Sequence, residues 1–125
     1  MKILLADDSA TIRMILKGLL KQLQIVDILE AANGQTALNL AAENAVDLIL
    51  LDIHMPVMDG LACLEKLKSQ PLTAAIPVIL ISSDTDEKQI ESARKFGAGS
   101  FVKKPFKVEG LREAIDMAVS ERVQH

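Results

Sequence analysis

The sequence predicts an α/β fold in which helices cover a parallel β-sheet. Short runs of leucine and β-branched residues alternate with stretches whose apolar residues recur every three or four positions, the spacing of one helix face. This alternation repeats five times along 125 residues and is typical of parallel strands joined by helical crossovers. Half of the residues are hydrophobic, which is enough for a single core, so we expect one domain spanning residues 1–125.

Five runs have the composition of strands. The first, third and fourth are predominantly apolar, as expected for strands that are buried on both faces of a sheet. The second contains Asp27 and Glu30, and the fifth is short and ends in two lysines, which is typical of edge strands. The five runs are 2–6, 25–31, 46–52, 77–82 and 100–104. This composition favours the strand order 2-1-3-4-5 of flavodoxin-like folds, with helices on both faces.

Residues that start and end helices stand between these runs. Asp8 and Ser9 are both candidates for the N-cap of the first helix, because a short polar side chain can accept a hydrogen bond from the first turn. Asp84 and Glu87 have capping-box spacing, and Asp84 is interpreted as the N-cap of the fourth helix. Gly97 is expected just beyond the end of that helix, where a left-handed backbone is common.

Composition and charge exclude several classes of function. The net charge is −3 and the chain has no tryptophan, tyrosine or basic run, so we expect no direct binding of nucleic acid. The single cysteine, Cys63, excludes an internal disulfide and a four-cysteine zinc site, and it indicates a cytoplasmic protein. The apolar start is interrupted by two aspartates and falls short of the ~20 residues that span a bilayer, so we expect no membrane segment.

Polar side chains appear where the predicted strands end. Asp7 and Asp8 follow the first run, Asp52 closes the third, Ser82 closes the fourth and Lys104 closes the fifth. The carboxyl ends of parallel strands lie at one edge of the sheet, where ligands bind in folds of this class. We therefore expect these five residues to converge on one pocket.

The predicted pocket has the chemistry of a metal-assisted phosphoryl site. Its carboxylates would repel one another by ~1 to 4 kcal/mol per pair at ~4 Å, so they require a cation. A few oxygen ligands favour Mg²⁺ that keeps several waters. With an ammonium group and a hydroxyl nearby, the pocket suits a phosphoryl group, and Asp52 is its best acceptor because it ends a central strand. The residues alone do not decide whether Lys103 or Lys104 supplies the ammonium group.

Five segments of the chain resemble, in order and spacing, the landmarks of response-regulator receiver domains. These are the CheY-like phosphoacceptors of two-component signalling. The segments are LLADDS, EAANGQTAL, LILLDIHMPVMDG, PVILISS and FVKKPF, and they cover essentially the whole chain. The resemblance implies that residues 1–125 form a single receiver domain, a signalling switch and not an enzyme, with Mg²⁺-dependent self-phosphorylation and self-dephosphorylation chemistry.

The resemblance also implies roles for residues around the acidic cluster. Asp52 would accept the phosphoryl group, and Asp52 and Asp8 would bind Mg²⁺ directly. Asp7 would act mostly through water, and the backbone carbonyl of His54 would complete the protein ligands. The His54 side chain is interpreted as a loop residue and not as a ligand. His54 and Asp84 occupy positions that influence the lifetime of the phosphoryl group in the family.

Further roles are implied near the ends of the fourth and fifth strands. Ser82 takes the position of the hydroxyl residue that moves toward a phosphoryl oxygen, and Lys104 takes that of the family's lysine. Phe101 takes the position of the switch aromatic, without the hydroxyl of the tyrosine often found there. The peptide bond between Lys104 and Pro105 is expected to be cis.

The resemblance implies partners on both sides of the switch. A sensor histidine kinase or a phosphotransfer protein would donate the phosphoryl group. The surface of the fourth helix, fifth strand and fifth helix would then control a downstream protein or a fused output domain, and a phosphorylation-dependent homodimer is left open. We expect no binding to a membrane.

Three alternatives compete with this interpretation. An aspartate-nucleophile phosphatase of the haloacid-dehalogenase type would have a second acid two residues after its nucleophile, where this chain has His54. A pseudo-receiver would use the same surfaces without phosphorylation. A flavin or nucleotide binder is disfavoured because the ADDS segment after the first strand would repel phosphate.

Overall fold

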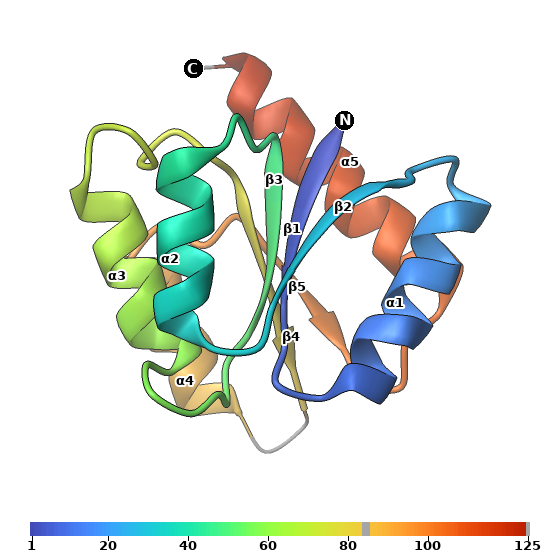
Figure 1. Ribbon diagram of the computed structural model, residues 1–125, viewed down its shortest axis with the longest axis horizontal. Coiled ribbons are helices and arrows are strands. Elements are labelled where there is room, and N and C mark those ends of the chain that lie inside the picture. The colour runs from blue at the N-terminus through green and yellow to red at the C-terminus, as the bar shows by residue number, and fades with distance from the viewer. Residues whose placement is uncertain (84–85, 125) are drawn as a thin grey trace.

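A five-stranded parallel sheet with helices on both faces forms the protein in a computed structural model, which describes residues 1–83 and 86–124 (Figure 1). The strand order is β2-β1-β3-β4-β5. The strands are β1 (Lys2–Ala6), β2 (Asp27–Ala31), β3 (Leu48–Asp52), β4 (Val78–Ser82) and β5 (Ser100–Lys103). The predicted fold class, strand order and edge positions of the second and fifth strands are therefore confirmed.

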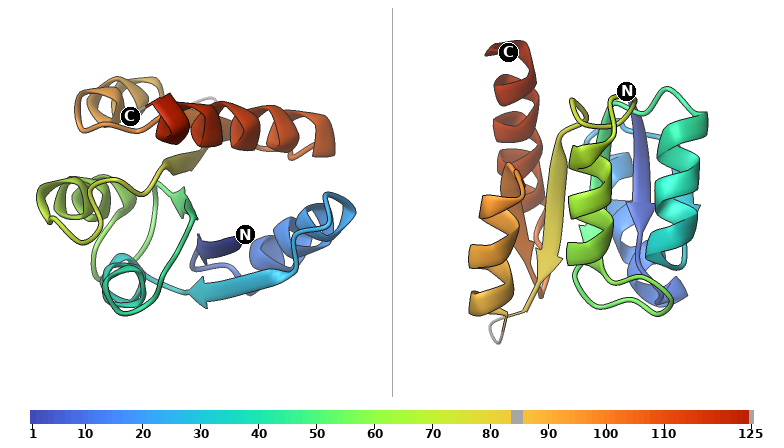
Figure 2. Two further views of the ribbon diagram at one scale, coloured as in Figure 1. Left: turned by 90° about the horizontal axis from the view of Figure 1, so that it is seen from above. Right: turned by 90° about the vertical axis from the view of Figure 1, so that its left-hand side faces the viewer.

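Five helices alternate with the strands and cover the two faces unequally. They are α1 (Ala10–Gln22), α2 (Gly34–Glu43), α3 (Gly60–Ser69), α4 (Glu87–Lys95) and α5 (Val108–Gln124). Helices α1 and α5 lie on one face, and α2, α3 and α4 lie on the other (Figure 2). No helix among the described residues is both long enough and apolar enough to cross a membrane.

Successive side chains of each strand enter two separate apolar cores. In β1, Ile3 and Leu5 pack toward α1 and α5, whereas Leu4 and Ala6 pack toward the other three helices. The same alternation runs through β3 and β4, every residue of which is buried. The central strands are covered on both faces, so their side chains are mainly apolar. The polar side chains stand at the strand ends, and the candidate site lies there.

Four of the described strands are shorter than the predicted runs, whereas β1 has the predicted bounds. Gln24 has a φ of 64°, and the Ile25 N–H donates to the Leu20 carbonyl at 2.9 Å, so Ile25 belongs to the turn after α1. Strand β2 therefore begins at Asp27 and not at residue 25. The other strands differ by one or two residues: β3 begins at Leu48, β4 begins at Val78 and β5 ends at Lys103.

Local side chains account for where the first and second helices begin. Of the two candidates for the cap of α1, Ser9 is the N-cap, and its Oγ accepts a hydrogen bond from the Ile12 N–H at 3.2 Å. Asn33 caps α2 by the same mechanism, accepting the Thr36 N–H at 2.8 Å. Both caps direct the chain from the carboxyl edge of the sheet into the next helix.

Helix α4 ends as predicted but begins differently. Gly97, with a φ of 96°, follows it, and its N–H donates to the Arg94 carbonyl at 3.2 Å, which closes the helix in a left-handed turn. The predicted N-cap, Asp84, lies outside the described residues. The helix begins at Glu87, directly after Asp86. The sequence spacing of Asp84 and Glu87 therefore does not mark the cap position.

Candidate functional site

Three carboxylates meet at the carboxyl edge of the sheet. One ligand oxygen from each of Asp7, Asp8 and Asp52 lies within 4.8 Å of the other two. The β1–α1 turn supplies the first two residues, and the end of the adjacent strand β3 supplies the third. Asp7 and Asp52 are buried, whereas Asp8 is exposed, so the cluster is open to solvent on the Asp8 side. The predicted convergence of the three acids is present in the structure.

Asp7 is held in place through its backbone and one of its carboxylate oxygens. Its N–H donates to the Ala31 carbonyl at 3.0 Å, and its Oδ1 accepts the Ser9 N–H at 2.9 Å. Its Oδ2 is buried and has no hydrogen-bond partner among the described residues. Burial raises the pKa of Asp7, although the Ser9 hydrogen bond and the charge of Lys104 oppose the rise. A buried carboxylate oxygen with no donor is suited to a cation or to water bound by one.

Asp52 contributes the third carboxylate of the cluster from the end of β3. Burial, followed by the negative charge of Asp7, raises the pKa of Asp52 to about 6. The charge of Lys104 and a long hydrogen bond of 3.3 Å from the His54 N–H act in the opposite direction. Asp52 is therefore mostly ionised at neutral pH, but its charge is destabilised by its surroundings.

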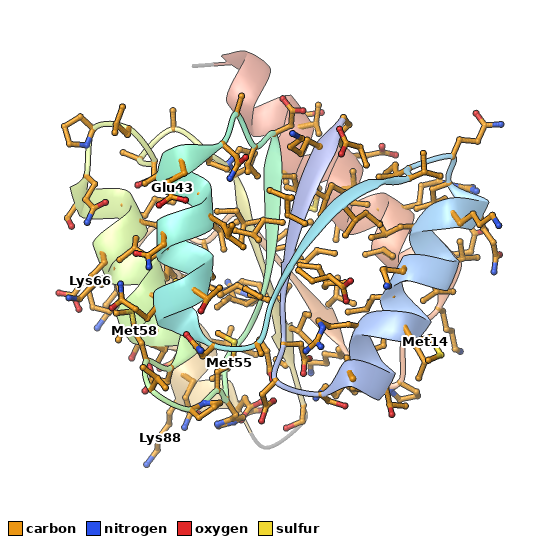
Figure 3. The ribbon with its side chains drawn as sticks, in the orientation of Figure 1. Met14, Glu43, Met55, Met58, Lys66 and Lys88 are labelled. Atoms are coloured by element: carbon orange, nitrogen blue, oxygen red, sulfur yellow. The ribbon has the colours of Figure 1, made fainter. Side chains whose placement is uncertain are left out.

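The loop after β3 is packed closely against the Asp52 backbone. The Gly60 N–H donates to the Ile53 carbonyl at 2.8 Å, and a Cβ atom at Gly60 would overlap the carbonyl oxygen of Asp52. Met55 and Met58 pack against the core beside the N-terminal end of α2 (Figure 3). The start of α3 is thus fixed in close contact with the backbone of Asp52.

Ser82 and Lys104 approach the cluster from the last two strands. Ser82 is buried, and its Oγ has no hydrogen-bond partner among the described residues. The Lys104 N–H donates to the Ser82 carbonyl at 3.0 Å, and the Lys104–Pro105 peptide bond is cis. The charge of Lys104 lowers the pKa values of Asp7 and Asp52.

Lys103 occupies different surroundings from Lys104. Its side chain lines a cavity beside α4 together with Ile90, Arg94 and Phe101. Lys104, whose charge lowers the pKa values of Asp7 and Asp52, remains the predicted ammonium group of the pocket. Phe101 is partly buried, and the Arg94 guanidinium carbon lies 5.2 Å from the centroid of its ring.

One contact at the site was not anticipated from the sequence. The His54 Nε2 atom lies 2.7 Å from Oδ1 of Asp86, and Oδ2 of Asp86 accepts hydrogen bonds from the N–H and the hydroxyl of Ser83 at 2.8 and 3.0 Å. The imidazole thus connects the loop after β3 to the start of α4. Asp84 and Asp86 have the same side chain within one short segment, so no sequence signal distinguished them as partners for His54.

The donor set fits a hard divalent cation. The cluster offers carboxylate oxygens only, and Oδ2 of Asp7 is buried without a hydrogen-bond partner among the described residues. Oxygen ligands in small number are the preference of Mg²⁺, which retains several waters and is bound through one or two carboxylates. Ser82 and Lys104 add a buried hydroxyl and an ammonium group, which are hydrogen-bond donors, to this edge of the sheet.

One known protein family matches most of the chain. The family described as "Response regulator receiver domain" matches residues 3–116 of the chain. The chain belongs to the response regulator receiver domain family. Receiver domains are signalling switches of two-component systems and are not classed as enzymes. The expected family, based on five sequence landmarks, is thereby confirmed.

Individual relatives of this receiver domain include chemotaxis proteins. The chemotaxis protein CheY of Pseudomonas aeruginosa is 34% identical over 123 residues, which are 98% of both chains. Among solved structures, the receiver domain of NtrX from Brucella abortus is 31% identical with a TM-score of 0.87, and 95% of this chain covers 98% of that one.

A more distant receiver structure holds a metal. It is the receiver domain of a sensor histidine kinase from Pseudomonas aeruginosa, with a magnesium ion coordinated in its active-site cleft. It is 24% identical to this chain and has a TM-score of 0.86. The match covers 95% of this chain and 97% of that one. At this identity the likeness shows that the fold is shared.

Proposed function

We propose that this receiver domain is a phosphorylation-activated switch that accepts a phosphoryl group on Asp52. The observation that carries the proposal is the pairing of an acidic cluster with two buried oxygens, Oδ2 of Asp7 and Oγ of Ser82, that have no partner among the described residues. An ion and a phosphoryl group would together provide the partners for both atoms.

The acidic cluster supports a magnesium site. Asp8 and Asp52 would bind the ion directly, Asp7 would act mostly through its waters, and the backbone carbonyl of His54 would complete the protein ligands. When bound, Mg²⁺ neutralises charge on the attacking carboxylate and on the phosphoryl oxygens. The magnesium-bound receiver domain from Pseudomonas aeruginosa shares the fold and is consistent with this assignment.

The chemistry proposed for Asp52 is in-line phosphoryl transfer. A carboxylate oxygen of Asp52 attacks the phosphorus of a phosphohistidine on a sensor kinase or phosphotransfer protein, or of a small phosphodonor. The new O–P bond forms as the P–N bond to the imidazole, or the P–O bond to the small donor, breaks. The pKa of about 6 leaves the carboxylate ionised at neutral pH, so no separate base is required. Hydrolysis of the aspartyl phosphate by water restores the carboxylate.

Ser82 and Lys104 would bind the phosphoryl group once it is attached. The Lys104 ammonium lies near enough to Asp52 to stabilise its negative charge, and it would neutralise the phosphoryl oxygens in the same way. The Ser82 hydroxyl would donate its hydrogen bond to one phosphoryl oxygen. A shift of Ser82 opens space on the α4 side, and Phe101, already partly buried there, would turn inward.

The proposed output is a change of population on the surface formed by α4, β5 and α5. Phosphorylation enriches only a conformation that binds the phosphoryl group better than the alternative conformation does. A shift of the ratio of these two conformations from 1:99 to 99:1 needs about 5.5 kcal/mol of differential stabilisation. That surface would control a downstream protein or a fused output domain. A phosphorylation-dependent homodimer is compatible with the same surface.

Intact-mass measurement after incubation with acetyl phosphate and Mg²⁺ tests the proposal. We expect one phosphoryl group on the wild type, none on Asp52→Asn, and none when a chelator replaces Mg²⁺. Asp116→Asn, an exposed acid on α5, is the matched control and should be modified like the wild type. An unmodified wild-type mass would overturn the proposal and favour a pseudo-receiver, and modification of Asp52→Asn would move the acceptor to another residue.

A further inference from the structure

We propose that Arg13 is a positioning residue for the cation site, because its guanidinium fixes the backbone of Asp7 and thereby the placement of the Asp7 carboxylate beside the other two. The inference rests on the proposed magnesium site and assigns no contact between Arg13 and the ion. It concerns the residue that keeps the site assembled before the ion binds.

Arg13 connects three parts of the fold. Its Nη1 donates to the Asp7 carbonyl at 2.5 Å, and its Nε donates to Oε1 of Glu30 at 3.0 Å. Arg13 lies in the first turns of α1, Asp7 lies in the β1–α1 turn, and Glu30 lies in the edge strand β2. The Arg13 side chain is only 18% exposed. The guanidinium therefore holds the acidic turn against both the helix that follows it and the neighbouring strand.

These contacts leave Oδ2 of Asp7 without a hydrogen-bond partner among the described residues. The Asp7 N–H donates to Ala31, its carbonyl accepts from Arg13, and its Oδ1 accepts from Ser9. The two anchors on β2, Glu30 for the guanidinium and Ala31 for the Asp7 N–H, are adjacent in sequence. The turn is thus fixed at both its N–H and its carbonyl, and the orientation of Oδ2 follows from that restraint. Residues that orient metal ligands in this way typically change metal affinity about 10- to 100-fold when they are lost.

If Arg13 acted only through its charge, its removal would strengthen Mg²⁺ binding, the opposite of what a positioning role predicts. The positive charge of Arg13 lowers the pKa of Asp7, so it also repels a cation approaching the cluster. Removing that charge would tighten Mg²⁺ binding if charge alone mattered. Removing a positioning contact would weaken it. The sign of the change in affinity therefore separates the two roles.

Lys17 provides a matched control for Arg13. Its Nζ lies 3.0 Å from Oε2 of Glu30, so it forms the same kind of ion pair with the same carboxylate. No contact between Lys17 and Asp7 occurs among the described hydrogen bonds and ion pairs. Charge-conserving exchanges at the two positions, Arg13→Lys and Lys17→Arg, therefore differ in whether they disturb the acidic turn.

Isothermal titration of the metal-free protein with Mg²⁺ tests the inference. We expect Arg13→Gln to weaken binding about tenfold and Lys17→Gln to change it by less than about twofold, because an exposed charge is screened by salt. Arg13→Lys should also weaken binding, because one ammonium cannot make both contacts of the planar guanidinium. Lys17→Arg should bind like the wild type.

A second measurement requires no metal. Amide hydrogen exchange of Ser9, whose N–H is bonded to Oδ1 of Asp7, should accelerate in both Arg13 variants and not in the Lys17 variants, in protein whose unfolding temperature shows that it is folded. If Arg13→Gln fails to fold, Arg13→Lys decides the question in both measurements. Unchanged or tighter Mg²⁺ binding by the folded Arg13 variants would overturn the inference and leave the magnesium site standing. Failure of the wild type to bind Mg²⁺ would overturn the proposed site itself, and the inference with it.

Discussion

The imidazole of His54 and the carboxylate of Asp86 are in direct contact, with Nε2 and Oδ1 separated by 2.7 Å. The two residues face very different surroundings, because the His54 side chain is 65% exposed and that of Asp86 is 4% exposed. Asp86 also accepts two hydrogen bonds from Ser83, the residue after Ser82. The contact thus connects the loop that follows the proposed acceptor to the segment that follows the proposed switch hydroxyl.

Removing the two partners of this contact should have unequal effects on stability. Asp86→Ala removes a buried carboxylate that accepts two hydrogen bonds from Ser83, and we expect it to lower the free energy of unfolding by about 2 kcal/mol. His54→Ala removes one polar contact to Asp86 from a side chain that is largely in solvent, with an expected loss below about 1 kcal/mol. Urea unfolding at neutral pH measures both losses. Equal losses would mean that the imidazole, and not the Ser83 hydrogen bonds, carries the contribution of Asp86.

Two glycines should respond to alanine in opposite directions. A Cβ at Gly60 would overlap the Asp52 carbonyl, so Gly60→Ala should lower the free energy of unfolding by about 3 kcal/mol and displace the loop beneath the site. Gly18 lies within α1 with open space around it, so Gly18→Ala should raise stability by about 1 kcal/mol through helix propensity. Thermal unfolding of the two variants checks both signs. A tolerated alanine at residue 60 would show that α3 can begin without close contact to Asp52.

The sequence was sufficient to predict the strand-end residues of the site because their placement follows from topology. Once the five runs are ordered as a parallel sheet, the residues that end the first, third, fourth and fifth strands must share one edge. Asp7, Asp52 and Ser82 could be placed in this way without any knowledge of side-chain geometry. The two adjacent lysines carry the same charge, so the residues alone left Lys103 and Lys104 open, and Lys104 was predicted from the resemblance to the family.

The contacts that orient the site could not be predicted in the same way. Arg13 and Glu30 each look like an ordinary charged surface residue, since neither lies at a strand end and 17 positions separate them. Their pairing depends on how far a long side chain of α1 reaches over the edge strand. The His54–Asp86 contact likewise joins loops 32 residues apart. Periodicity reports which face of an element is buried, but it does not report which polar side chains meet across two elements.

The raised pKa of Asp52 predicts how the stability of the metal-free protein depends on pH. The folded state holds the proton of Asp52 more tightly than the unfolded state, so stability falls as pH rises from about 4 through about 6. The difference between 3.8 and about 6 corresponds to about 3 kcal/mol at neutral pH. Asp52→Asn should remove this loss and be more stable than the wild type by up to about 3 kcal/mol at pH 7, but not at pH 4.

Urea unfolding at pH 4 and pH 7, with and without Mg²⁺, distinguishes this effect from a general gain in stability. Bound Mg²⁺ stabilises the folded state in proportion to its affinity, about 2.7 kcal/mol at a hundredfold excess over its dissociation constant. The wild type should therefore regain stability when Mg²⁺ is added at pH 7. Asp52→Asn lacks one of the three carboxylates, so its free energy of unfolding should increase little. Asp116→Asn should follow the wild type in every condition. An advantage of Asp52→Asn that is the same at pH 4 and pH 7 would contradict the origin assigned to it, because at pH 4 the Asp52 carboxyl already holds its proton.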